Sequence, residues 1–111
     1  MKNLHFPGGS VLTGNDLADA LMQYAEALCN RRQFDVVNIP VVGDDGQLGR
    51  AHMLIGSATQ LVSVTAGYTG PELVEPETVD FLNRKSMAGA MIPASWTREE
   101  PVAAQFDEFD Y

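Results

Sequence analysis

The fold of this chain is decided by residues 34–55, which read FDVVNIPVVGDDGQLGRAHMLI. The stretch contains two runs of β-branched and apolar residues, Phe34–Val42 and Leu48–Ile55, which favour extended strands. Between them lies Gly43-Asp44-Asp45-Gly46, whose residue types tolerate the backbone conformations of a tight connection. The stretch therefore predicts a β-hairpin. Pro40 lacks a backbone N–H, so we expect the first strand at a sheet edge or interrupted by a bulge.

Two further segments are candidate strands. Leu61–Ala66 has the same apolar and β-branched composition and follows the turn residues Gly56-Ser57-Ala58-Thr59, so we expect an antiparallel meander over residues 34–66. Ser10–Thr13 follows the turn residues Pro7-Gly8-Gly9 and could add a short strand. The sheet is thus expected to contain three or four strands.

An amphipathic helix is predicted from Asn15 to Arg32, because leucines recur there at helical spacing among polar residues. We expect Thr13 or Asn15 to accept hydrogen bonds from the free N–H groups of its first turn. A shorter helix is predicted from Pro76 to Lys85. These elements define an α+β fold in which a mostly antiparallel sheet carries the long helix on one face.

The alternation of side chains along the strands predicts two unequal sheet faces. The apolar face, expected under the long helix, would carry Val37, Ile39, Val41, Gly49, Ala51, Met53, Ile55, Val62, Val64 and Ala66. The other face would carry Val36, Asn38, Pro40, Val42, Leu48, Arg50, His52, Leu54, Leu61, Ser63 and Thr65. This second face is too apolar to remain in water, so we expect it to be covered. A second copy of the chain could cover it, or residues 86–96 could fold back over it.

Length and composition fit one domain. The chain has 111 residues, of which 45% are apolar and 20% charged, enough for one core of ordinary proportions. We assign residues 1–96 to a single α+β domain. Residues 97–111 form an acidic-aromatic tail that we expect to be flexible or ordered by a partner.

Charge and cysteine content exclude several partners and compartments. Fifteen acidic and seven basic side chains give a net charge of −8, which opposes binding to nucleic acid or to an anionic membrane surface. Cys29 is the only cysteine, cannot form an internal disulfide and suits a reducing compartment. The sequence contains no recognisable signal peptide or membrane span, so we expect a cytoplasmic protein.

Catalytic and metal-binding patterns are not recognisable. The only histidines are His5 and His52, and no cluster has the spacing of metal ligands, so we expect no metal and no cofactor. Cys29 falls late in the predicted helix, where the negative helix end disfavours a thiolate. Ser57 lacks the second glycine of a nucleophile elbow. The chain is therefore expected to be non-catalytic.

One pair of residues suggests a ligand site. Arg50 and His52 are two positions apart on one strand, so they share a face and could together hold a carboxylate or phosphate, with Asp44, Tyr68 or Trp96 nearby. The alternative is that both are polar residues at an interface margin, paired with Asp44 or Asp45. The sequence leaves both interpretations open.

The C-terminal sequence FDEFDY, residues 106–111, combines aromatic anchors with acidic groups and could dock onto another protein. The candidate partner-binding residues are Trp96, Phe106, Phe109 and Tyr111. We therefore predict a small non-catalytic interaction module, homodimeric through its second sheet face. The alternative is an anion-binding protein, or a cofactor-free enzyme, with a site near Arg50 and His52 at a subunit interface.

Overall fold

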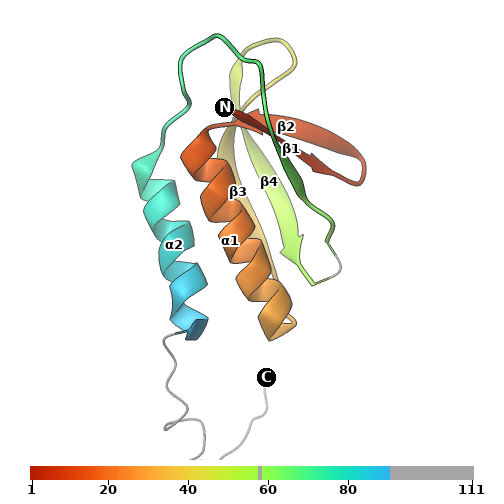
Figure 1. Cartoon of the computed structure of the whole chain (residues 1–111), viewed down its shortest axis with the longest axis vertical. Helices are drawn as coiled ribbons and strands as arrows, with labels where there is room; N and C mark the ends of the chain where they lie inside the picture. Colours follow the sequence, from red (N-terminus) through yellow and green to blue (C-terminus); the bar gives the residue numbers. More distant parts are fainter. Residues whose placement is uncertain (58, 91–111) are drawn as a thin grey trace, which may run out of the picture.

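The computed structural model describes residues 1–57 and 59–90, and within them the chain forms two helices and five strands (Figure 1). The elements follow one another as β1 (Lys2–Phe6), β2 (Gly9–Thr13), α1 (Asn15–Arg31), β3 (Phe34–Val42), β4 (Leu48–Gly56), β5 (Val62–Thr65) and α2 (Pro76–Ala90). The predicted α+β class is therefore confirmed. Neither helix in the described ranges is long and apolar enough to cross a membrane.

The strands form one antiparallel sheet in the order β4-β3-β2-β1-β5. The predicted count of three or four strands is wrong, since the described residues contain five. Strand β1 escapes prediction because Lys2–Phe6 is short and includes Asn3 and His5, which carry no β signal. The predicted meander is also wrong at its third strand, because β5 pairs with β1 and not with β4.

The faces of β3 and β4 agree with the predicted alternation except at Pro40 and Val42, which were predicted on the second face and are buried. The two strands pair along their whole length, from Phe34 opposite Gly56 to Val42 opposite Leu48. Their inward side chains form much of the core, namely Val37, Ile39, Val41, Met53 and Ile55. The predicted turn closes this ribbon, with Gly46 at φ 79° and its N–H donating to the Gly43 carbonyl at 2.9 Å.

The faces of β5 are the reverse of the predicted ones. Val62 and Val64 are exposed, while Leu61 packs against the core. Strand β5 takes its phase from β1, where the fully buried Leu4 lies opposite Ser63. Because β5 does not continue the ladder of β4, the alternation established in β3 and β4 does not carry over to it.

The two halves of the sheet meet at a single residue pair in the described chain, Leu12 opposite Val42. Beside this pair the Thr13 hydroxyl donates to the Pro40 carbonyl at 2.8 Å. The predicted edge position or bulge of this strand is wrong, because β3 lies between β4 and β2 and its pairing with β4 is continuous. Pro40 has no N–H for a ladder, and only one residue of β3 pairs with β2. Residues 57–61 join strands at opposite ends of the strand order, and in a flat sheet those strands would be about 19 Å apart. We conclude that the sheet is curled.

Helix α1 packs inside this curl, burying Leu17, Ala18, Ala20, Leu21, Tyr24 and Leu28. The predicted cap is wrong. The N-cap residue is Gly14, and the Asn15 N–H donates to the Glu72 carboxylate at 2.5 Å, across 57 positions in the sequence. Thr13 cannot serve as the cap because its hydroxyl is bonded to Pro40.

Helix α2 lies beside α1 (Figure 1) and is longer than predicted. Its Leu82 is buried, and Arg31 of α1 donates to the carbonyls of Lys85 and Ser86 at 3.0 and 2.8 Å. Residues 87–90 continue this helix, so their predicted return over the second sheet face is wrong. The rest of that segment and the predicted tail lie outside the described residues.

Candidate interaction surface

The outer face is the side of the paired strands β3 and β4, the β3–β4 ribbon, that faces away from the helices. It consists of Phe34, Val36, Asn38, Pro40, Val42, Leu48, Arg50, His52 and Leu54. Four of its large apolar side chains are exposed: Phe34 by 55%, Val36 by 60%, Leu48 by 73% and Leu54 by 61%. Hydrophobic side chains scattered singly are ordinary on a protein surface, but four on one ribbon make this face the candidate interaction surface.

The apolar residues of the outer face lie at its two ends. Val36 is directly opposite Leu54, and Phe34 follows on the same face of β3. At the hairpin end Leu48 lies opposite Val42. Between these ends the cross-strand pairs are Asn38 with His52 and Pro40 with Arg50, so the centre of the outer face is polar.

The polar centre contains the two residues that the sequence singles out. The Arg50 Nε donates to the Asn38 Oδ1 at 2.8 Å, and the Asn38 Nδ2 lies 3.0 Å from the His52 Nε2. The structure therefore brings Arg50 and His52 onto the same amide group. The Arg50 Nη1 also forms an ion pair with the Glu75 Oε1 at 2.8 Å.

This network fixes the proton on the His52 ring. Because the Asn38 oxygen accepts from Arg50, the Asn38 amide nitrogen faces His52 and donates to its Nε2. An accepting Nε2 in a neutral imidazole leaves the proton on Nδ1. His52 is exposed, so the outer face offers an N–H donor to whatever covers it.

Glu75 is the residue of this site that the sequence analysis misses. It precedes the first residue of α2, and its pKa lies below the usual range because the Thr78 hydroxyl and then Arg50 donate to its carboxylate. A carboxylate before Pro76, at the start of a predicted helix, is the signal that could have indicated it. An anion that binds Arg50 must therefore compete with Glu75.

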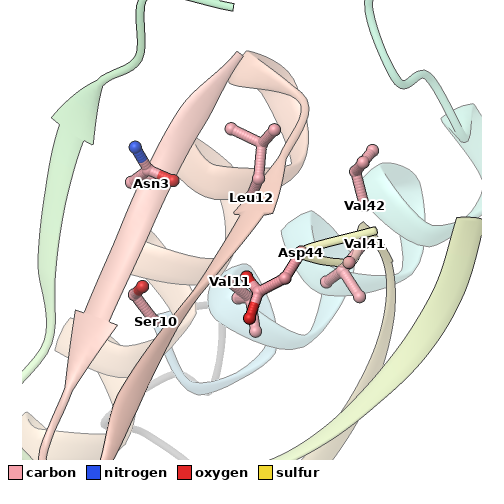
Figure 2. Close-up of a pocket in the computed structure, with 8 residues that line it drawn as sticks. Asn3, Ser10, Val11, Leu12, Val41, Val42 and Asp44 are labelled. Carbon is pink, nitrogen blue, oxygen red and sulfur yellow. The ribbon is translucent and has the colours of Figure 1, made fainter. Parts of the chain in front are cut away.

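Asp44 is not among the described hydrogen-bond partners of Arg50 or His52. It lines a hollow of about 390 Å³ where β2 and β3 separate, and Figure 2 shows Asn3 on β1 across this hollow from Val41 and Val42. The described partners of Arg50 are Asn38 and Glu75, and neither Asp44 nor Tyr68 is among them. The remaining predicted residues, Trp96, Phe106, Phe109 and Tyr111, lie outside the described ranges.

A second polar cluster joins α1, β3 and α2. The Tyr24 hydroxyl donates to the Asp35 Oδ2 at 2.5 Å, and the Lys85 Nζ donates to the same oxygen at 3.0 Å. Burial, and then the bond to Asp35, raise the pKa of Tyr24, while the bond to Asp35 raises the pKa of Lys85. Both shifts lead away from neutral pH, so neither residue is suited to act as a general base. The cluster holds α2 to the ribbon.

Two observations concern metal and thiol chemistry. Within the described part of the chain, no group of three or more histidine, cysteine, aspartate or glutamate residues is placed to hold a metal ion. Cys29 is exposed, and its thiol donates to the Gly56 carbonyl at 3.3 Å. The Cys29 thiol is thus hydrogen-bonded to the last residue of β4.

Comparisons with known proteins identify no relative of this chain. No protein-family model, no curated protein and no solved structure matches this chain. The geometry of the outer face is therefore the basis for inferring a function.

Proposed function

We propose that this chain is a non-catalytic protein-interaction module that associates with a second copy through the outer face. The observation that supports the proposal is the exposure of Phe34, Val36, Leu48 and Leu54 on one paired ribbon. Fully burying one such side chain contributes about 1.5 to 3 kcal/mol, so covering four of them favours association.

The arrangement of the outer face suits two-fold symmetry. A two-fold axis running across the strands would place the apolar end of one copy, with Val36 and Leu54, over the Leu48 end of its partner. The Arg50–Glu75 ion pairs would then lie near the centre, where each cation already has its own carboxylate. Self-association therefore leaves no like charges unpaired at these positions.

The experiment is light scattering coupled to size exclusion on the full chain over a range of concentrations. We expect a dimer that dissociates when Leu54→Glu introduces a charge into the face. Met87→Glu is the matched control, because Met87 is exposed by 55% on α2 and should leave the dimer intact. A monomer at all concentrations, or equal effects of both variants, would contradict the proposal.

A second candidate function is the binding of a small anion at Arg50 and His52. It is supported by the convergence of both side chains on Asn38. Because Glu75 occupies the Arg50 Nη1, we expect Glu75→Gln to strengthen the binding of inorganic phosphate and Arg50→Ala to abolish it. The measurement is the shift of the His52 ring signals during a phosphate titration, and identical affinities in all three proteins would exclude the site.

A further inference from the structure

In the part of the chain that the structure describes, strand β4 has a free backbone edge. Across the described ranges it pairs with β3 alone, and it stands at one end of the strand order. Its nine residues contain no proline, and their pairing with β3 has no bulge. Proteins usually protect such an edge, because its unpaired N–H and C=O groups can accept a further strand.

A groove runs along this edge. It has a volume of about 380 Å³ and touches four consecutive residues of β4, from Ala51 to Leu54. Successive side chains of a strand point to opposite faces, so a groove that contacts four in a row must follow the edge of the strand. The opposite wall consists of Phe6, Pro7 and Val11, in and beside the β1–β2 hairpin. The contacted stretch of β4 is about 10 Å long.

The walls of the groove define the chemistry of an occupant. Phe6 and Val11 pack partly against the core and give the groove an apolar side. On the other side lies the exposed His52, whose Nδ1–H can donate a hydrogen bond to an occupant. Strand β4 carries no acidic residue, although the chain as a whole has a net charge of −8, and its one cation, Arg50, is paired with Glu75 outside the groove lining.

We propose that the groove beside β4 binds an extended peptide segment of another protein in which acidic residues alternate with apolar ones. The peptide adds as a strand to the free edge, directs its apolar side chains toward Phe6 and Val11, and places a carboxylate against His52. The groove shares His52 and Leu54 with the outer face of the proposed dimer. Ala51 and Met53 line the groove and do not belong to the outer face, so changes at these two residues distinguish the two sites.

The test uses the full chain and a short capped peptide in which glutamate alternates with valine. We expect the amide signals of Ala51 to Leu54 to shift on titration. A peptide with proline in place of its central valine should not bind, because it cannot complete the ladder. Equal binding of both peptides, no binding, or shifts confined to Phe34 and Val36 would overturn the proposal.

A pair of histidine variants tests the predicted carboxylate contact. We expect His52→Glu to weaken peptide binding at least about tenfold, which corresponds to the loss of one hydrogen bond to a charged group. His5→Glu is the matched control, because His5 is exposed on β1 and lies outside the groove lining. Equal weakening by both variants would show a general charge effect and contradict the site.

Hydrogen exchange of the protein alone identifies any other occupant. We expect the edge-facing amides of β4 to exchange quickly without peptide and slowly with it. Slow exchange that is independent of protein concentration would show that the chain's own residues hold the edge. Slow exchange that increases with concentration would show a second copy there, and either result would overturn the proposal.

Discussion

The two halves of the sheet are specified in different ways. In the β3–β4 ribbon a four-residue turn sets the register, and every cross-strand pair follows from it. In the other half β1 pairs with β5, so Leu4 lies opposite Ser63, a residue that is far from it in the sequence. A local turn makes the faces of a strand readable from the sequence, whereas a distant partner sets the phase of β5 independently of its neighbours in the chain.

The largest effect is expected at the junction between α1 and the segment after β5. A Cβ at Gly14 would overlap the Leu73 carbonyl oxygen, which is backbone and cannot move alone. We expect Gly14→Val to lower the free energy of unfolding by about 3 kcal/mol, measured by urea denaturation. Gly49→Ala is the control, because a Cβ there meets open space, and it should change stability by less than about 0.5 kcal/mol. Equal effects would contradict the close approach.

The reversed phase of β5 can be tested with two truncations. Leu61 packs against the core, whereas Val64 is exposed. We expect Leu61→Ala to lower the free energy of unfolding by about 1.5 kcal/mol, since the side chain is only partly buried, and Val64→Ala to change it by less than about 0.5 kcal/mol. A larger loss of stability for Val64→Ala than for Leu61→Ala, in thermal or urea denaturation, would instead support the faces predicted from the sequence.

The hairpin of the ribbon should tolerate change better. Gly46 adopts a φ of 79°, which costs a residue with a side chain about 1 kcal/mol. We expect Gly46→Ala to lower stability by this amount while the register of β3 and β4 stays unchanged. The measurement is urea denaturation together with the amide spectrum of the ribbon. A shift of the pairing would mean that the turn alone does not hold the register.

The smallest effect concerns Glu72, which caps α1 from a distance. The Asn15 N–H, and then the terminal amino group, lower the pKa of this exposed carboxyl below its ordinary value of 4.5. A depressed folded-state pKa contributes stability above the ordinary pKa and loses it as the pH falls through the folded-state value. We expect the difference in thermal stability between the wild type and Glu72→Gln to be present at pH 7 and to shrink below about pH 4.5. A difference that is constant with pH would exclude the ionic cap.

The candidate site could be predicted from the sequence in part. Arg50 and His52 share a face because strand alternation requires it, and the structure joins them through Asn38, which lies opposite His52. Glu75 could not be found in this way, because it reaches Arg50 from the start of α2, beyond β5. Asp44, which the sequence analysis expects near them, is not among the described partners of Arg50 and lines the hollow between β2 and β3.

By itself the sequence determined the elements that depend on interactions between residues close together in the chain. The repeat of leucines defined α1, and the composition on either side of the Gly43–Gly46 turn defined the ribbon and its two faces. Hydrophobic periodicity and turn conformation depend on residues only a few positions apart, so both can be recognised in the sequence.

Only the tertiary structure decided how these elements close on one another. The β1–β5 pairing, the cap that Glu72 supplies to α1 and the position of β4 at one end of the described sheet all depend on which distant segments meet. Such contacts are selected by the burial of the whole core, and no residue alone specifies its partner there. For the same reason, the sequence predicted a cover over one face of the ribbon, and in the described structure neither helix covers the exposed side chains of that face.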